Sequence, residues 1–397
     1  MEENFAPDVW GRFFWMEGMG RSMVKVLTVF GTRPEAIKMA PVIRALQSAR
    51  SRFDVKVVVT GQHREMLDQV LDFFDIIPDH DLSIMRHGQT LTDITCGVLK
   101  GLEPILRSES PDVVLVHGDT TTTFAASLAA FYQQIAVGHV EAGLRSYDMY
   151  NPFPEEMNRR LTSSMTTFHF APTHPAMANL AKEGVPESRI FLTGNTVIDA
   201  LLEAVKGDYV FFNPVLKELD FVNERVILLT THRRENWGLP MERIFQAVSQ
   251  LVEDFPDVRV VFPVHKNPKI RELARSVLGK LPRVNLIEPP AYEEFANLMA
   301  KSHFLLTDSG GLQEEAPSLG KPVLVLRDTT ERPEGVEAGT ALLVGTDTQR
   351  IVDEATKLLT DGKAYAKMAD SPNPYGDGQA APRIAEILWE KRALKDL

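Results

Sequence analysis

The stretch from Asp308 to Pro317 contains residues whose types and spacing point directly to chemistry. It follows a short apolar run, 304–307, that predicts a buried strand, and Ser309-Gly310-Gly311 then begins a predicted helix. Free backbone N–H groups at the positive end of a helix dipole form a site for an anion such as phosphate. Glu315 lies about one helical turn further on, where its carboxylate would accept hydrogen bonds from the two hydroxyls of a ribose. This combination suggests a nucleotide site, and the alternative is a tight turn with a solvated helix face.

Two cations follow the first predicted strand, which ends at Phe30. Arg33 and Lys38 lie where a dinucleotide-binding Rossmann enzyme would carry Gly-x-Gly-x-x-Gly. Neither that fingerprint nor a Walker loop is present, so we expect no dinucleotide cofactor and no P-loop triphosphate, and we predict no metal site. Arg33 and Lys38 either bind an anionic ligand or are ordinary surface charges.

Three carboxylates occupy similar positions further along the chain. Asp119 follows the predicted strand 113–117, and Glu141 follows the next strand, 135–140. Glu155 is expected on the loop after that strand. Because neighbouring parallel strands end at one edge of a sheet, Asp119 and Glu141 should lie close together, as acid–base chemistry on a sugar requires. Asp119 alone could instead cap the helix that follows it.

The second half of the chain also places polar residues after a strand. His232-Arg233-Arg234 follows the predicted strand 226–230, where these side chains could neutralise a diphosphate. Charge-assisted hydrogen bonds contribute about 1.5–3 kcal/mol each, which would help a nucleotide to depart. Arg327 and Arg332, which follow the strand 323–326, could reach the same cleft, and the weaker candidates His117 and His265 could be structural histidines with satisfied hydrogen bonds.

Strand-like apolar runs alternate with helix-length segments along the chain, and this alternation predicts how the candidates are positioned. Runs this apolar, separated by helices, are typical of parallel sheets buried on both faces. The sequence predicts an α/β protein with two Rossmann-like, doubly wound domains that face a central cleft, where the carboxyl ends of the strands bind ligands. The predicted strands are 24–30, 55–60, 113–117, 135–140, 168–171 and 190–192 in the first domain, and 226–230, 258–264, 284–287, 304–307 and 323–326 in the second.

The alternation is interrupted between Gly207 and Glu224, and we place the linker between the two domains there. The N-terminal domain would span residues 23–206 and carry the catalytic carboxylates, and the C-terminal domain would span 207–375 and bind the nucleotide. Residues 376–397 contain a last helix. Residues 1–22 lack the continuous apolar core of a signal peptide, and we expect them to be a poorly ordered extension.

Composition limits the partners and the compartment. The 397 residues carry a net charge of 43 − 54 = −11, which argues against a nucleic-acid partner because such a partner requires a basic face. No uninterrupted apolar stretch of about 18 residues occurs, so no membrane span is predicted. The single cysteine, Cys96, excludes an internal disulfide and fits the reducing cytoplasm, and we expect its side chain to pack within a helix.

Several long motifs occur in a fixed order along the chain. They are Gly31-Thr32-Arg33-Pro34-Glu35-Ala36-Ile37-Lys38, His117-Gly118-Asp119-Thr120-Thr121, His139-Val140-Glu141-Ala142-Gly143-Leu144-Arg145 and the runs that begin at His232 and Ser309. Together they resemble the non-hydrolysing bacterial UDP-N-acetylglucosamine (UDP-GlcNAc) 2-epimerases, from about Lys25 to the C-terminus. The resemblance implies the GT-B fold, a homodimer and a C-terminal helix that packs back onto the first domain. It also implies interconversion of UDP-GlcNAc and UDP-N-acetylmannosamine (UDP-ManNAc), which supplies precursors of cell-surface polysaccharide.

The resemblance assigns roles by matching position. It implies that the active-site residues are Asp119, Glu141, Glu155 and His232. It implies that UDP is held by Arg33, Lys38, Phe295, Ser309, Gly310, Glu315 and Arg332. Some relatives bind a second, activating UDP-GlcNAc, and the segments that match this regulatory site contain Gln62 and His63. Glu65 and Gly88 replace the Gln and Arg of close relatives, so we expect reduced activation.

The chemistry of the sugar limits the routes to inversion at C2. The C2 hydrogen is not next to a carbonyl, which excludes simple enolisation, and without a nicotinamide site oxidation of a neighbouring carbon is disfavoured. Elimination of UDP to a 2-acetamidoglucal, followed by re-addition, remains, and the resemblance implies the same course. Three alternatives stay open: a hydrolysing epimerase, a GT-B glycosyltransferase and a non-catalytic nucleotide-sugar sensor. The three carboxylates disfavour the sensor, because a binding protein has no need of them.

Overall fold

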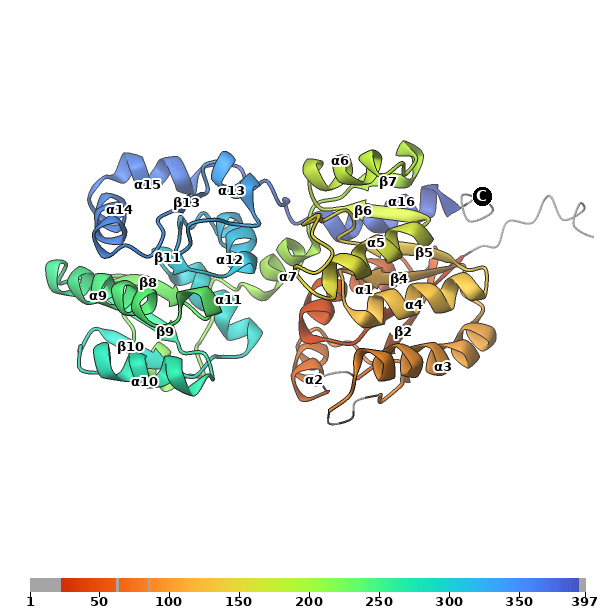
Figure 1. Cartoon of the computed structure of the whole chain (residues 1–397), viewed down its shortest axis with the longest axis horizontal. Coiled ribbons are helices and arrows are strands. Elements are labelled where there is room, and N and C mark those ends of the chain that lie inside the picture. The colour runs from red at the N-terminus through yellow and green to blue at the C-terminus, as the bar shows by residue number, and fades with distance from the viewer. Residues whose placement is uncertain (1–22, 62–63, 85, 87, 393–397) are drawn as a thin grey trace, which may run out of the picture.

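Two parallel β-sheets organise the chain, one in each half (Figure 1). The structure is a computed structural model that describes residues 23–61, 64–84, 86 and 88–392. The strands of the first half are β1 (Val24–Phe30), β2 (Phe53–Val59), β3 (His80–Asp81), β4 (Val113–His117), β5 (Ala136–Val140), β6 (Phe168–Ala171) and β7 (Ile190–Leu192). Those of the second half are β8 (Arg225–Thr230), β9 (Val258–Pro263), β10 (Val284–Ile287), β11 (Phe304–Thr307), β12 (Val323–Val325) and β13 (Ala341–Leu343).

The order of the strands is that of doubly wound sheets. Within the described residues the first sheet runs β3-β2-β1-β4-β5-β6-β7 and the second β10-β9-β8-β11-β12-β13, with every neighbouring pair parallel. The direction of winding reverses between β1 and β4 in the first sheet and between β8 and β11 in the second. Such reversals open a crevice at the carboxyl ends of the strands, where α/β proteins bind ligands.

Helices cover both faces of each sheet (Figure 1). The first half contains α1 (Arg33–Ser48), α2 (Arg64–Phe73), α3 (Leu91–Glu109), α4 (Thr121–Tyr132), α5 (Glu155–Met165), α6 (His174–Lys182) and α7 (Thr196–Ala204). The second half contains α8 (Pro214–Lys217), α9 (Leu239–Asp254), α10 (Pro268–Val277), α11 (Tyr292–Lys301), α12 (Gly310–Glu315), α13 (Pro333–Glu337), α14 (Thr348–Thr360) and α15 (Gly362–Ala369), and α16 (Ala380–Glu390) follows.

Burial on both faces explains why the central strands are mostly apolar. Val26 and Phe30 of β1 belong to a core that includes side chains of α1 and α2. Leu27 and Val29, which point to the opposite face, belong to a core formed with α3 and α4. A strand buried in this way cannot alternate with polar residues, so it reads as a continuous apolar run.

The last helix, α16, lies against the first half of the molecule. It contacts α1 and α7, and Ile384 and Leu388 enter the core formed with α1. The N–H groups of Ala380 and Ala381 donate to the Asp199 carboxylate of α7 at 3.2 and 2.8 Å, which fixes the start of α16. The chain therefore passes between the halves twice, once after α7 and once before α16 (Figure 1).

The predicted fold class, two doubly wound α/β units, is confirmed. The strands β3 and β13 were absent from the prediction, because runs of two and three residues give little periodic signal. Glu155 begins α5 and does not lie in a loop as expected. The expectation that Cys96 packs inside is wrong, because its side chain is exposed. Cys96 lies two positions after the buried Ile94, so it points to a different face of α3.

Candidate functional site

A pocket of about 260 Å³ lies at the carboxyl ends of β8 and β9, where the second half faces the first. It brings together four of the predicted site residues, Arg33, His232, Phe295 and Ser309. The other lining residues are Thr230, Thr231, Pro263, His265, Pro289, Pro290 and Leu312. Arg33 is the one lining residue that comes from the first half, so the pocket is completed across the two halves.

Glu35 fixes the loop that carries Arg33. Its Oε2 accepts the N–H groups of Gly31 and Thr32 at 3.0 and 2.8 Å, in the capping box of α1. Its Oε1 accepts the hydroxyl of Thr120, at the start of α4, at 2.6 Å. The buried Glu35 carboxylate therefore joins the loops after β1 and β4, and the orientation of α1 places Arg33 and Lys38 on the side of the second half.

Asp308 holds His232 at the rim of the pocket. The backbone N–H groups of His232 and Arg233 donate to its Oδ2 at 2.9 Å each, and the His232 Nδ1 lies 3.2 Å from its Oδ1. Burial would raise the pKa of Asp308, but the hydrogen bond from His232 and its charge outweigh it, so the pKa is lowered. The His232 ring also stacks on the His265 ring, with centroids 5.8 Å apart.

The predicted anion site around Ser309 differs in one respect from the expectation. The Ser309 N–H donates to the Thr307 hydroxyl at 3.0 Å, so it is already paired. No side chain caps the start of α12. A Cβ atom on Gly310 would lie 3.8 Å from Nη2 of Arg233, which shows that this guanidinium lies beside the first turn of α12. Arg233 also lies 3.6 Å from the Glu331 carboxylate, so at this position its charge is shared between that carboxylate and any anion bound at the first turn.

Glu315, the predicted acceptor of the ribose hydroxyls, lies beside this turn and is half-buried. A Cβ atom on Gly311 would lie 3.4 Å from its Oε1, so the carboxyl group faces Gly311. Burial, with the neighbouring Glu314 adding to it, raises the pKa of Glu315 to about 8. The group is therefore mostly protonated at neutral pH before a ligand binds.

Glu141 lies at the centre of the carboxylate group in the first half. Its side chain forms an ion pair with Lys38, accepts a hydrogen bond from Asn195 Nδ2 at 3.1 Å and lies 3.7 Å from His117 Nε2. Burial would raise its pKa, but Lys38 and His117 outweigh burial and hold the pKa well below its ordinary value. The backbone φ of Glu141 is 65°, a conformation that costs free energy in a residue with a side chain and is concentrated at functional sites.

Asp119 is not the N-cap of α4, so the interpretation of this residue as a helix cap is wrong. Thr120 is the N-cap, and its hydroxyl accepts the Thr123 N–H at 3.1 Å. The Asp119 carboxylate instead pairs with Arg159 of α5 at 2.6 and 3.0 Å. Arg159 lies one helical turn after Glu155, and both project from the start of α5.

Two further groups near these carboxylates lack hydrogen bonds. Oε2 of Glu155 is buried and has no hydrogen-bond partner among the described residues. The same is true of both ring nitrogens of His117, so the interpretation of His117 as a satisfied structural histidine is wrong. The backbone pairing of His117 with Val140 brings the ends of β4 and β5 together, and with them Asp119 and Glu141. The first half thus brings Asp119 and Glu141 to one edge of its sheet, and Glu155 begins α5, the helix whose Arg159 pairs with Asp119.

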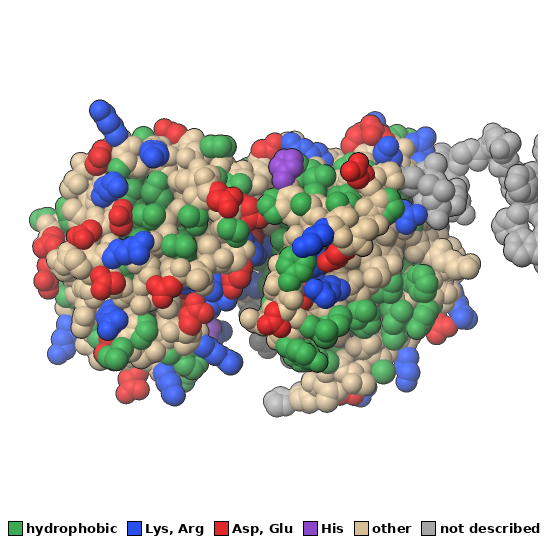
Figure 2. All heavy atoms as spheres, turned by 45° about the horizontal axis from the view of Figure 1, so that its top comes forward, with side chains coloured by type: hydrophobic (Ala, Val, Ile, Leu, Met, Phe, Trp, Pro, Cys, Tyr) green, Lys and Arg blue, Asp and Glu red, His purple; other side chains and the backbone are tan. Residues whose placement is uncertain are grey.

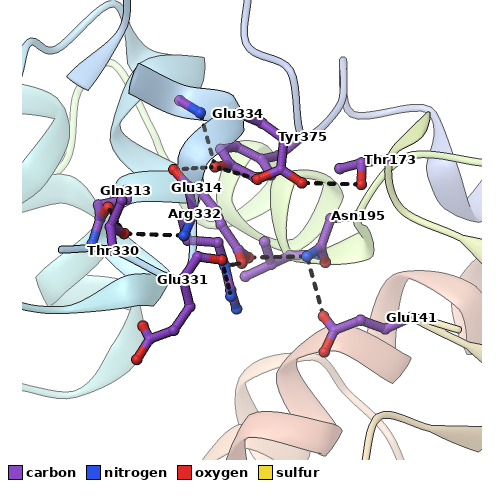
Figure 3. A network of polar contacts seen from close by, with 12 residues as sticks. Glu141, Thr173, Asn195, Gln313, Glu314, Thr330, Glu331, Arg332, Glu334 and Tyr375 are labelled. Carbon is purple, nitrogen blue, oxygen red and sulfur yellow. Dashed lines mark hydrogen bonds and ion pairs between the residues drawn. The ribbon is translucent and has the colours of Figure 1, made fainter. Parts of the chain in front are cut away.

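A polar network links this carboxylate group to the second half (Figure 3). Asn195 Nδ2 lies 3.1 Å from Oε2 of Glu141 and 3.0 Å from Oε2 of Glu314 on α12. Glu314 in turn forms an ion pair with Arg332. The charge of Glu314 outweighs burial and raises the pKa of Arg332. Arg332 was expected to contact the nucleotide, and the structure places its guanidinium against this carboxylate.

Sequence reasoning assigned no role to four residues of this site, Asp308, Asn195, Glu314 and Arg159, although Asp308 and Glu314 lie in the stretch that it singled out. Asp308 carried a usable signal, since it directly follows the apolar run of β11 as Asp119 follows that of β4. Asn195 precedes a helix and reads as an ordinary N-cap, which it also is. The partners of Glu314 and Arg159 lie 18 to 119 residues away in the chain and have no local signature.

The candidate regulatory residues Gln62 and His63 lie outside the described residues. A second cavity, of about 510 Å³, lies beside the segment that contains Gly88. It is lined by Leu82, Ser83, Ile84, Arg86, Gly88, Gln89, Asp93, Cys96, Gly97 and Lys100. This cavity is separate from the pocket at His232, which Arg33, Phe295 and Ser309 line; the other residues predicted to hold UDP, Lys38, Gly310, Gly311, Glu315 and Arg332, are not among its lining residues.

Two features are absent from the part of the chain that the structure describes. No cluster of three or more His, Cys, Asp and Glu side chains in this part of the chain is arranged to hold a metal ion. Of the helices between residues 23 and 392, none is sufficiently long and apolar to span a bilayer.

Comparison with known proteins identifies the family. Residues 44–389 match the protein family described as UDP-N-acetylglucosamine 2-epimerase. The chain is 58% identical over 365 residues to the UDP-N-acetylglucosamine 2-epimerase of Bacillus subtilis (strain 168), an alignment that covers 92% of this chain and 95% of the relative. It is 55% identical over 382 residues to the enzyme of the same name from Escherichia coli (strain K12), covering 93% and 99%.

Solved structures give the same result. A crystal structure of UDP-N-acetylglucosamine 2-epimerase matches with a TM-score of 0.86 and 56% identity, covering 93% of this chain and 96% of that one. The UDP-GlcNAc 2-epimerase from Neisseria meningitidis bound to UDP-GlcNAc matches with a TM-score of 0.81 and 52% identity, covering 92% and 100%. The chain therefore belongs to the UDP-N-acetylglucosamine 2-epimerase family.

Proposed function

We propose that this protein is a non-hydrolysing epimerase that reversibly converts UDP-GlcNAc into UDP-ManNAc. The observation that carries the proposal is the connection between the two candidate sites through α12. The first turn of α12 lines the nucleotide-type pocket with Ser309, and its Glu314 shares the Asn195 amide with Glu141. A nucleotide bound at Ser309 would therefore direct its sugar toward the carboxylates of the first half.

The reaction proceeds by elimination and re-addition. One carboxylate removes the proton from C2, and the electron pair of that C–H bond forms the C1–C2 double bond while the C1–O bond to UDP breaks. UDP and a 2-acetamidoglucal are then both present in the site. Delivery of a proton to the opposite face of C2 and addition of a UDP oxygen at C1 give the other epimer, with no net consumption of water.

Glu141 and Asp119 are the groups best placed to move the proton. Glu141 is held ionised by Lys38, as a base must be. Asp119 lies at the end of the neighbouring strand, and its pairing with Arg159 fixes its orientation. The buried, unpaired oxygen of Glu155 supplies a third polar contact for the sugar.

The departing UDP would be stabilised by the pocket in the second half. His232, held by Asp308, and the first turn of α12 at Ser309 to Gly311 would face the diphosphate, and Arg33 would approach it from the first half. Phe295 and Leu312 supply apolar surface for the uracil ring. Groups aimed at charge that develops in the transition state accelerate the reaction, because they need not reorganise.

Incubation with UDP-GlcNAc alone separates this proposal from its alternatives. A non-hydrolysing epimerase yields UDP-ManNAc, a hydrolysing epimerase yields free N-acetylmannosamine and UDP, and a glycosyltransferase or a sensor yields no epimer. In deuterated water the product should carry deuterium at C2. Product that retains its original hydrogen would exclude the elimination route.

Four further parts of the proposal rest on the family resemblance or on the sequence itself. The enzyme would work in the cytoplasm as a homodimer and feed the synthesis of cell-surface polysaccharide. Activation by a second UDP-GlcNAc would be reduced, because Gly88, which lines the second cavity, has no side chain with which to bind a diphosphate. The test is conversion of UDP-ManNAc alone and then with a trace of UDP-GlcNAc, and a strong dependence on the trace would contradict the expectation.

A further inference from the structure

The side chain of Asn195 is held in one orientation between the two halves (Figure 3). Its Oδ1 accepts the Val197 N–H at 3.0 Å, as the N-cap of α7. Its Nδ2 donates to Glu141 at 3.1 Å and to Glu314 at 3.0 Å. A flipped amide would direct its oxygen at two carboxylates and would lose the cap, so the hydrogen-bond partners themselves fix the assignment of oxygen and nitrogen.

Asn195 lies between two ion pairs, one from each half. Lys38 neutralises Glu141, and Arg332 neutralises Glu314. Both carboxylates are shielded from water, with side chains 10% and 4% exposed, and Asn195 itself is 3% exposed. In such surroundings, the loss of a hydrogen-bond donor to a carboxylate oxygen costs free energy. Like charges on two facing carboxylates also repel each other. The two N–H bonds of one amide satisfy both carboxylates at once.

We propose that Asn195 is a positioning residue of the epimerase, one that orients Glu141 and keeps it ionised for proton transfer at C2. The inference rests on the proposed function. A hydrogen bond donated to the charged form of an acid favours that form, so Asn195 helps to keep Glu141 ionised. Its second hydrogen bond, to Glu314, anchors the amide to α12, the helix whose first turn lines the nucleotide-type pocket.

The test uses Asn195→Ser, which keeps an N-cap oxygen but removes the amide. We expect kcat for UDP-GlcNAc to fall by about 10–100-fold with little change in KM, because misplacing a reacting group costs rate more than binding. The acidic limb of the pH profile of kcat/KM should move to higher pH, since Glu141 loses a donor to its charged form. The matched control is Asn213→Ser at the N-cap of α8, which lies outside the site. There the side chain accepts the Val215 N–H at 2.9 Å.

A purely structural role for Asn195 would lower Tm and leave the shape of the pH profile unchanged. An unchanged pH profile, or an unchanged kcat, would overturn the role of Asn195 and leave the proposed function standing. A wild-type enzyme that makes no UDP-ManNAc would overturn both. Glu314→Gln provides a second variant in case Asn195→Ser does not fold. It removes a negative charge next to the shared amide, so the acidic limb should move to lower pH, and an unshifted limb would contradict the coupling between α12 and Glu141.

Discussion

At Glu315, burial and the neighbouring Glu314 raise the pKa to about 8, so the isolated protein carries a mostly neutral carboxyl group at pH 7. The hydroxyls of a ribose are donors, and donors favour the ionised form of a carboxyl group. Binding of a nucleoside diphosphate and loss of a proton from Glu315 should therefore be linked. This linkage distinguishes a diol acceptor from a carboxyl group that is buried only for packing.

We predict that UDP binding at pH 7 releases up to about one proton from the wild-type enzyme. Titration calorimetry in buffers with different ionisation enthalpies measures this number directly. The variant Glu315→Gln keeps the shape of the side chain and should release no proton from this position. Equal proton release by both proteins would show that Glu315 does not contact the ribose.

The same pKa shift should appear in stability without any ligand. Since the folded-state pKa lies above the ordinary value of 4.5, protonated Glu315 contributes stability that is complete below about pH 4.5 and is lost as the pH rises through about 8. The difference in free energy of unfolding between wild type and Glu315→Gln should fall by up to about 1.4 kcal/mol per pH unit within that window. Urea unfolding at a series of pH values measures it, and a constant difference would contradict the shift.

The pKa of Glu141 is shifted downward, opposite to that of Glu315, because Lys38 and His117 favour its charged carboxylate. Glu141→Gln preserves the shape and removes the proton-transfer group, so kcat should fall by about 10²–10⁴-fold, as expected for the loss of general acid–base catalysis. Exchange of the C2 hydrogen with deuterated water should slow in parallel. Near-normal turnover in this variant would assign Glu141 a structural role.

At the scale of elements, the loop after β5 is shaped by a close contact with α6. Gly143 has a φ of 91°, and a Cβ atom there would lie 2.2 Å from the carbonyl oxygen of Ala176. Only glycine can combine this backbone conformation with this approach. The contact holds the loop that begins with Glu141, so the position of a reacting group depends on a glycine two residues later.

Gly143→Ala should destabilise the protein by well over about 1 kcal/mol, because both the conformation and the space exclude a Cβ atom. Gly184→Ala is the matched control, since Gly184 has a φ of 86° but nothing within 4 Å of the added atom. Gly184→Ala should lose only the contribution of the backbone conformation to the free energy of unfolding, about 1 kcal/mol. Denaturant unfolding of both variants measures the difference, and equal losses would show that the loop moves away from α6 at little cost.

Most helices and strands could be predicted from the sequence, whereas the contacts between their side chains could not. The run 24–30 coincides with β1 because burial on both faces makes this strand apolar apart from Lys25 and Thr28. The same reasoning placed Asp119 and Glu141 at the ends of neighbouring strands. It could not predict that Arg159 pairs with Asp119 or that Arg332 pairs with Glu314, because such pairs depend on how helices pack and leave no periodic pattern.

At the scale of the whole molecule, charged side chains of both signs are scattered over the face shown in Figure 2, and hydrophobic side chains gather on the first half (on the right). The exposed hydrophobic residues of this half include Phe131 and Tyr132 at the end of α4, which are 58% and 66% exposed. Exposed aromatic side chains in adjacent positions are a common feature of protein–protein interfaces. They support the proposed homodimer and suggest that α4 takes part in it.

Light scattering should therefore give a mass of about twice 44.4 kDa for the wild-type protein. Replacing Phe131 and Tyr132 together by Asp should shift the protein toward the monomer, because charged groups would be buried at the contact. The exposed Phe212, in the segment between the two halves, is the control position, and Phe212→Asp should leave the mass unchanged. A dimer that survives the double substitution would place the interface elsewhere.

The second chain crossing, which precedes α16, is fastened to the first half at the loop before α7. The Asn195 N–H donates to the Tyr375 carbonyl oxygen at 2.7 Å, and a Cβ atom on Gly194 would lie 3.3 Å from the Cα of Gly376. A single linker would let the halves swivel in any direction, whereas a second crossing fastened to the first half beside Asn195 favours rotation about an axis through that place. Points near such an axis move least. Opening would therefore widen the gap between Arg33 and Ser309 while the environment of Glu141, beside Asn195, stays nearly constant through each cycle of substrate entry and product release.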